Sequence, residues 1–211
     1  MDTLNLIPNA AAAPTPQKRM PVLFLFVFLG LGILVLIAIP VVRFFAWSHS
    51  YNLRAFVARG NSICPAICAS ERFLAGMDAF DSGTPQRGDV ILFEHEGSRT
   101  WWIKRVIAIS GDTVAFGSGA TGSETAMLVN GKPVALPPPC GGFVSHPIPA
   151  APGSPLADVK VEDSSLFVIG DNLDHSYDSR QFGTIRVNKV RGKALLIYWS
   201  SSASRIGCKI R

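Results

Sequence analysis

Charged residues are scarce in this chain. Asp, Glu, Lys and Arg make up 17% of its 211 residues, against 48% hydrophobic residues. The mean hydropathy of +0.28 is high for a soluble protein, so part of the chain is expected to face lipid. The net charge is +5, but the basic residues are scattered and no nucleic-acid-binding module is recognisable. Nucleic acid is therefore not expected as a partner, whereas anionic lipid headgroups would attract this positive charge.

Residues that build metal sites or histidine triads are also few. The cysteines do not form two C-x-x-C pairs, which argues against zinc and favours disulfides or buried thiols. They are Cys64, Cys68, Cys140 and Cys208. Four cysteines allow three disulfide pairings, and all three remain open. The four histidines are not placed as a triad requires. We expect neither a metal nor a cofactor.

One apolar run accounts for the high hydropathy. PVLFLFVFLGLGILVLIAIPVV, from Pro21 to Val42, contains no charged residue. A helix of this length crosses a hydrocarbon core of about 30 Å. The run is longer than the core of a cleaved signal peptide, and no small-x-small site follows it. We interpret residues 21–42 as a single transmembrane anchor rather than a core helix of a soluble protein.

The anchor separates two other parts of the chain. Residues 1–20 are rich in Ala and Pro and are expected to form a disordered tail. Residues 43–211 are enough for one domain with a hydrophobic core. Because basic residues flank both ends of the anchor, their distribution does not fix its orientation.

The domain after the anchor has the pattern of a mostly β, antiparallel fold. Runs rich in Val, Ile, Phe and Trp are separated by Gly, Asn, Asp or Ser. They cover residues 87–96, 100–110, 112–116, 126–136, 164–171, 183–190 and 193–200. The Asn-Gly pair in VNGKPV predicts a tight hairpin turn. Residues 69–80 fit either a short helix or an extended segment. A Pro/Gly-rich stretch, Pro137–Pro155, predicts a surface insertion around residues 115–160.

A lysine lies inside one of these apolar runs, WWIKRVIAIS. Strict alternation places Lys104 on one face with Trp102, Val106 and Ala108. Desolvation would lower the pKa of its amine, and a neutral lysine can act as a general base. The alternative is a lysine on an edge strand that extends its amine to solvent. Arg105 points to the opposite face, where it can pair with a carboxylate.

Two further stretches carry groups that such a base would need. In RGNSICPAIC, Ser62 follows Gly60, which allows close approach of a substrate, and precedes Pro65, which stiffens the turn. A serine is a poor nucleophile until a base removes its proton, and alone this serine would be an ordinary turn residue. GDNLDHSYDSRQFG, residues 170–183, places carboxylates, serines, a histidine and an arginine between two predicted strands.

Together these stretches resemble the sequence boxes of type I signal peptidases, which are membrane-anchored proteases with a Ser/Lys dyad. NSICPAI resembles their nucleophile box, Ser-Met-x-Pro-Thr, and RGDVILF and WWIKRVIAISGDTV resemble the next two boxes. GDNLDHSYDSRQFG matches the last box, Gly-Asp-Asn-x-x-x-Ser-x-Asp-Ser-Arg-x-aromatic-Gly. The order of the boxes and an anchor before the serine also agree. The matches cover most of Gly60–Thr113 and Gly170–Ile185.

The resemblance implies a role for each matching residue. Ser62 is the expected nucleophile and Lys104 the expected general base. Gly60 stands where some family members have an oxyanion-binding serine, so the backbone N–H of Ser62 is expected to bind the oxyanion. A serine that hydrogen-bonds the lysine, together with two Asp–Arg pairs, is expected to support the base. These residues are Ser176, Asp178, Arg180, Arg105 and Asp171.

The nucleophile box departs from the family pattern in several places. Ile63 replaces the usual Met, and Ala66 replaces the usual Thr. Leu173, in the last box, stands where Arg is frequent. Cys64 and Cys68 beside the nucleophile are unusual, and a bridge between them would fix the loop. These differences bear on rate and specificity more than on the chemistry.

The implied function is an endopeptidase that removes signal peptides from exported precursors after small residues. Its expected partners are signal-peptide-bearing precursors and the lipid bilayer, and tethering both in one membrane raises their effective concentration. The expected location is the plasma or inner membrane, with the catalytic domain on the outer face. One alternative is a peptidase dedicated to a pilin or conjugation-type precursor. Another is a non-catalytic scaffold tethered to the membrane.

Overall fold

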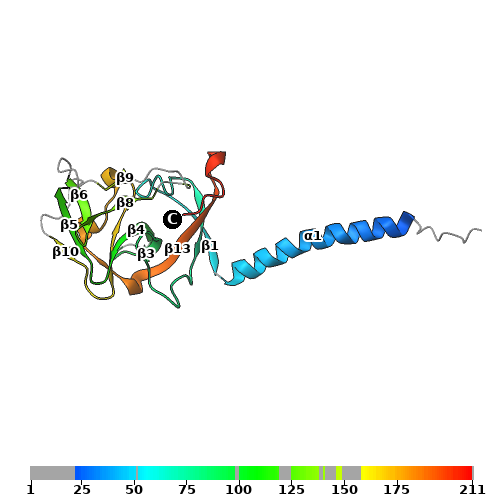
Figure 1. Cartoon of the computed structure of the whole chain (residues 1–211), viewed down its shortest axis with the longest axis horizontal. Coiled ribbons are helices and arrows are strands. Elements are labelled where there is room, and N and C mark those ends of the chain that lie inside the picture. Colours follow the sequence, from blue (N-terminus) through cyan, green and yellow to red (C-terminus); the bar gives the residue numbers. More distant parts are fainter. Residues whose placement is uncertain are drawn as a thin grey trace, which may run out of the picture. The chain divides into compact units, whose positions relative to one another are not determined.

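The computed structural model describes residues 22–50, 52–97, 100–118, 125–137, 140, 146–148 and 158–210 (Figure 1). These residues form two units, with the boundary after Ala46. The predicted tail at residues 1–20 lies outside the described residues, as do parts of the predicted insertion around residues 115–160.

The first unit consists of one long helix, α1 (Val22–Ser50), which contains Pro40. Its segment Phe26–Ala46 has a mean hydropathy of 2.6, and none of its most apolar window is buried within the described protein. Such a helix is long and apolar enough to cross a membrane, which is consistent with an N-terminal anchor. The helix continues beyond the predicted end at Val42, through the aromatic residues that follow.

The second unit is built on a seven-stranded antiparallel sheet, ordered β1-β2-β13-β3-β4-β11-β12. The strands are β1 (Leu53–Val57), β2 (Arg72–Gly76), β3 (Val90–Glu94), β4 (Trp101–Ile109), β11 (Ser165–Ile169), β12 (Ile185–Arg186) and β13 (Val190–Trp199). The predicted mostly β, antiparallel fold is confirmed. Residues 69–80, which fitted either a helix or an extended segment, contain β2, because this stretch pairs with both β1 and β13.

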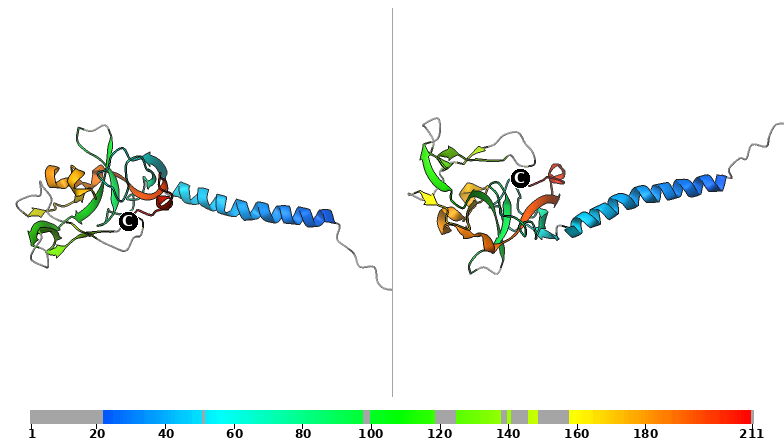
Figure 2. Two further views of the ribbon diagram at one scale, coloured as in Figure 1. Left: turned by 90° about the horizontal axis from the view of Figure 1, so that it is seen from above. Right: turned by 60° about the horizontal axis from the view of Figure 1, so that its bottom comes forward.

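A smaller sheet, ordered β10-β5-β6-β7, lies at the end of this unit opposite β1 and β2 (Figures 1 and 2). Its strands are β5 (Thr113–Ser118), β6 (Thr125–Val129), β7 (Lys132–Pro133) and β10 (Val159–Lys160). A separate pair joins β8 (Ala135–Leu136) to β9 (His146–Pro147). The predicted Asn-Gly turn connects β6 and β7, with positive φ angles of 52° at Asn130 and 75° at Gly131.

Strand β4 runs through the middle of the core. Its partner β11 shifts register between Phe167 and Val168, so that Ile107 is an extra residue on β4. Strict alternation fails at this point. Val106 packs in one buried cluster, whereas Ala108 packs with Ile107 in another. The prediction that Ala108 shares the face of Lys104 is therefore wrong, because the bulge reverses the alternation beyond Val106.

The structure contains two disulfides, which correspond to one of the three possible pairings. Cys64 is bonded to Cys68, four residues away, and Cys140 is bonded to Cys208, 68 residues away. In the chain-entropy account, the longer loop contributes about 4 kcal/mol and the shorter about 2 kcal/mol, because each restricts the unfolded chain. The first bond closes the turn after Ser62, and the second ties down the C-terminal segment after β13.

Candidate active site

Ser62 lies in a short turn between β1 and β2 that is held by its apolar side chains. Ile63 and Ile67 are almost fully buried, and the N–H of Ile67 donates to the carbonyl of Ile63 at 3.0 Å. The side-chain oxygen of Asn61 accepts from the N–H of Ala69 at 2.9 Å and closes the turn. Ser62 itself stays partly exposed at the start of this turn. The turn therefore presents one hydroxyl on a rigid backbone.

Lys104 comes from β4, and its side chain reaches Ser62. Its Nζ lies 2.8 Å from Ser62 Oγ, and the residue is only 4% exposed. Burial lowers the pKa of Lys104 from 10.5 to about 8, and Arg180 adds to this effect, whereas the carboxylates of Asp178 and Asp171 oppose it. A large fraction of these amines is therefore neutral near pH 8 and able to accept the serine proton.

The loop after β11 is organised around Asp178, which is fully buried. Its carboxylate accepts from the N–H of Gly170 at 3.0 Å and from Arg180 Nε at 2.8 Å. It also caps α2 (Ser179–Phe182). Arg180 Nη2 donates to the carbonyl of Leu173 at 2.7 Å. The Asp178–Arg180 pair thus fixes the course of the loop that lies beside Lys104.

A second buried ion pair joins β4 to the same loop. Arg105 Nε donates to Asp171 Oδ1 at 2.8 Å, and its Nη2 donates to Oδ2 at 2.7 Å. Arg105 Nη1 also donates to the carbonyl of Gly88 at 2.7 Å. Because Arg105 follows Lys104 on β4, this two-bond contact sets the distance between β4 and the loop after β11.

The loop also directly contacts the turn that carries Ser62. The N–H of Asn172 donates to the carbonyl of Ser62 at 3.2 Å. Gly170 packs so closely that a Cβ on it would overlap both the Ser62 carbonyl oxygen and the Ser176 side chain. Ser176 is 8% exposed, and its Oγ has no hydrogen-bond partner within the described part of the chain. The expected hydrogen bond between Ser176 and Lys104 is thus not formed in this structure.

A cavity of about 310 Å³ opens beside the two residues. Ala58, Arg59, Gly60, Ser62, Trp101, Trp102, Ile103, Lys104 and Tyr177 line it. Its surface is mainly apolar, and the N–H of Ser62 donates to no acceptor among the described residues. Residues 90–93 of β3 are buried in the core and do not line this cavity.

Known proteins similar to this chain identify its family. Residues 27–199 match the family model described as signal peptidase, peptidase S26. The chain belongs to this family.

Curated members of the signal peptidase family cover most of the chain. It is 27% identical over 173 residues to signal peptidase I of Bacillus caldolyticus, a match that spans 76% of this chain and 84% of that protein. It is 31% identical over 147 residues to signal peptidase I V of Bacillus subtilis (strain 168), across 65% of this chain and 80% of that protein. A crystal structure of a signal peptidase I from Enterococcus faecalis V583 matches at 26% identity, covering 52% of this chain and 95% of that chain, with a TM-score of 0.37. Family membership makes this chain a signal peptidase I, a serine endopeptidase.

A larger cavity in this signal peptidase lies away from the two residues. It measures about 510 Å³ and is lined in part by Arg87, Asp89 and Lys193, but by neither Ser62 nor Lys104. Its cations are already paired, Arg87 with Asp112 and Lys193 with Asp89. The smaller cavity, where the Ser62 hydroxyl meets the buried Lys104 amine, is therefore the candidate active site.

Some residues of the site could not be predicted from the sequence. Tyr177 has no distinguishing sequence signal, because a single tyrosine in a polar loop resembles a surface residue. It nevertheless lines the cavity and packs against Phe182 with ring centroids 5.6 Å apart. The contact from Asn172 involves its backbone N–H, which no side-chain pattern reports. Trp101 had a signal, because it stands in the same strand run as Lys104.

The close contact at Gly170 gives a prediction for this signal peptidase. In Gly170→Ala, the added methyl group would push the Ser62 carbonyl and Ser176 apart, and precursor cleavage should fall by about 100-fold because nucleophile placement tolerates little displacement. Cleavage by the full-length protein in detergent measures this. Gly83→Ala is the control, because a Cβ there meets nothing within 4 Å. Cleavage by Gly170→Ala at the rate of the control would contradict the described contact.

Proposed function

We propose that Ser62 is the nucleophile and Lys104 the general base of this signal peptidase. The observation that carries the proposal is the 2.8 Å contact between Ser62 Oγ and a buried amine whose pKa is lowered to about 8. As Ser62 Oγ attacks the scissile carbonyl carbon, its proton passes to the neutral Nζ of Lys104. The resulting ammonium then protonates the leaving amine as the peptide C–N bond breaks, which leaves an acyl group on Ser62.

The second half of the reaction restores the enzyme. The amine of Lys104, neutral again, accepts a proton from a water molecule as that water attacks the acyl carbon. The ester bond to Ser62 breaks, and the proton returns to its Oγ. In both halves the N–H of Ser62, which donates to no acceptor in the described part of the chain, is suited to donate to the oxyanion. Gly60, two residues earlier, leaves room for the substrate.

The surrounding polar groups support the lysine in this proposal. The buried pairs Asp178–Arg180 and Arg105–Asp171 hold the loop against β4, so that Lys104 stays aligned with the serine. Ser176 is buried against the turn that carries Ser62, and its hydroxyl has no partner among the described residues, so it is available to the ammonium form of Lys104 after proton transfer. The complete set argues against a scaffold that has lost catalysis.

We infer that the substrates are precursors that carry signal peptides and are cut after small residues. The cavity beside Ser62 is mostly apolar, with Ala58, Trp102 and Ile103 among its lining, which suits an uncharged side chain. The apolar helix α1 would hold the enzyme where such precursors are themselves held by their apolar segments. Two disulfides favour an oxidising compartment, and hence the outer face of the plasma or inner membrane.

Membrane vesicles of known sidedness test this proposal. We expect full-length protein in right-side-out vesicles to cleave added precursors after a small residue, as mapped by mass spectrometry, and inverted vesicles to cleave only after detergent is added. A panel of general preproteins and one pilin-type precursor defines the clients. Cleavage of the pilin precursor alone would favour the dedicated peptidase. Cleavage by sealed inverted vesicles would overturn the orientation, and no cleavage in detergent would overturn the function.

A further inference from the structure

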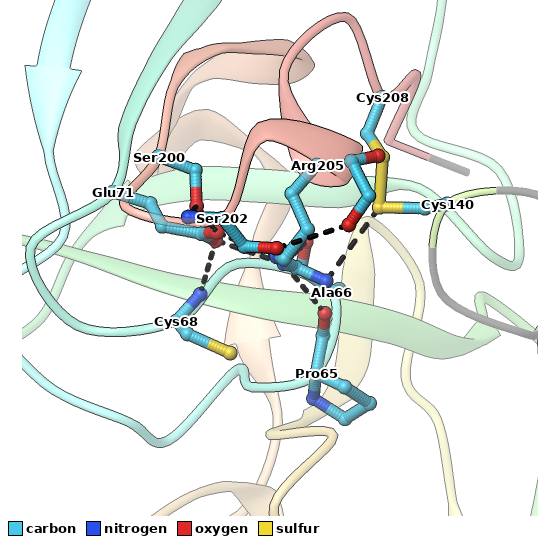
Figure 3. The surroundings of a disulfide bond; sticks show 10 residues. Pro65, Ala66, Cys68, Glu71, Cys140, Ser200, Ser202, Arg205 and Cys208 are labelled. Carbon is cyan, nitrogen blue, oxygen red and sulfur yellow. Dashed lines mark hydrogen bonds and ion pairs between the residues drawn. A yellow bond between two sulfur atoms is a disulfide. The ribbon is translucent and has the colours of Figure 1, made fainter.

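The C-terminal segment reaches back to the turn that carries Ser62. After β13, the short helix η4 (Ala203–Arg205) points the side chain of Arg205 at this turn (Figure 3). Arg205 Nη2 donates to the carbonyl of Pro65 at 2.9 Å and to the carbonyl of Ala66 at 3.2 Å. Arg205 therefore binds the backbone of the nucleophile turn on the half that follows Ser62.

Glu71, the residue immediately before β2, completes this contact. It is 4% exposed, and its Oε2 accepts from Arg205 Nη2 at 2.8 Å. The same Oε2 accepts from the N–H of Cys68 at 2.8 Å, and Oε1 accepts from the hydroxyl of Ser200 at 2.7 Å. Burial alone would raise the pKa of Glu71, but these bonds lower it below its usual value, so the carboxylate stays charged. Arg205 and Glu71 thus hold the second half of the turn at three backbone groups.

The segment that carries Arg205 is itself fixed in place. Cys208 is bonded to Cys140 beside Arg205 (Figure 3). The N–H of Gly207 donates to the carbonyl of Ile197 at 2.8 Å, and the N–H of Ile210 donates to the carbonyl of Leu195 at 2.9 Å. These bonds fasten the end of the chain to β13. Arg205 therefore acts from a rigid support.

We propose that Arg205 is a positioning residue, which places Ser62 for attack by clamping the backbone of its turn. The inference rests on the proposed role of Ser62 as nucleophile. Asn172 holds the carbonyl of Ser62 itself, and Arg205 holds the carbonyls three and four residues later, so the turn is fixed at both ends. The guanidinium pairs with both carboxylate oxygens of Glu71, through Nε and Nη2, while Nη2 also reaches the two carbonyls. A lysine ammonium has a single nitrogen with three donors and cannot bind all four acceptors.

The variant Arg205→Lys tests this positioning role, because it keeps the positive charge but removes the guanidinium. A lysine can still pair with Glu71 but cannot make all of these bonds, so kcat should fall by about 10- to 100-fold. The KM should change by less than about threefold, because Arg205 does not line the cavity beside Ser62. The pH midpoint of the rate should stay in place, because Lys104 is unaltered. Arg191→Lys is the matched control, since Arg191 makes a similar two-bond pair with Glu94 and donates nothing to the turn.

A second variant separates positioning from folding. In Arg205→Ala, low millimolar guanidinium should refill the space beside Glu71 and raise kcat several-fold without raising the melting temperature. Wild-type kcat in Arg205→Lys would overturn the inference. The inference would also be overturned if kcat of Arg205→Ala fell only in proportion to the loss of folded protein and guanidinium did not restore it. The proposed function fails on a different result, namely cleavage by Ser62→Ala, so the two failures are distinguishable.

Discussion

Replacing Ser62 by alanine should lower the rate of precursor cleavage by about 10⁴-fold or more, because the proposed nucleophile that forms the acyl intermediate is then absent. The fold should remain, since Ser62 is only partly buried and its turn is held by Ile63, Ile67 and Arg205. Cleavage by the full-length variant in detergent, with its melting temperature, measures both effects.

The matched control is Ser82→Ala, which removes the same hydroxyl from an exposed loop. It should cleave at the wild-type rate. If Ser62→Ala kept more than about a hundredth of the wild-type rate, Ser62 would not be the nucleophile.

Replacing Lys104 by methionine should abolish cleavage and also stabilise the fold at pH 7. The folded-state pKa of about 8 lies below the ordinary 10.5, so at pH 7 the amine is charged in both states and the fold bears the cost of burying it. The difference between the two pKa values corresponds to roughly 3 kcal/mol, which is an upper value for the gain in free energy of unfolding. Denaturant unfolding at pH 7 measures this gain.

The pH dependence of that gain provides its own control. As the pH rises from about 8 to 10.5, the buried amine of Lys104 loses its proton and the folded wild type no longer holds a buried charge. The excess free energy of unfolding of Lys104→Met over the wild type should therefore shrink and then vanish. Lys132→Met, at an exposed position, should show neither effect. A Lys104→Met variant that is active, or that is less stable than the wild type at pH 7, would contradict the account.

Much of the fold could be predicted because it depends on local pattern. The apolar runs became strands of the two sheets, and the Asn-Gly pair became the turn between β6 and β7. Strand β1 was not predicted, because Leu53–Val57 is short, carries Arg54 and is largely exposed. The extended form of β2 depends on its two neighbours in the sheet, and no local pattern reports such pairing.

The site was predictable only in part. Alternation along one strand marked Lys104 as buried, but its meeting with Ser62 came from the family resemblance, since no spacing rule brings together residues 42 positions apart. Arg205 was missed for the same reason, because its partner Glu71 lies 134 positions away and the C-terminal stretch has no periodicity. The disulfide pairing also depended on distances that exist only in the folded chain.

The central claim is that Lys104 holds a readily removable proton while it contacts the serine hydroxyl. An NMR titration of isotope-labelled lysine side chains in the full-length protein, with Lys104→Met to assign the signal, measures this directly. The account predicts that Lys104 titrates with a midpoint of about 8. A midpoint near 10.5, the value of an ordinary exposed lysine, would contradict it.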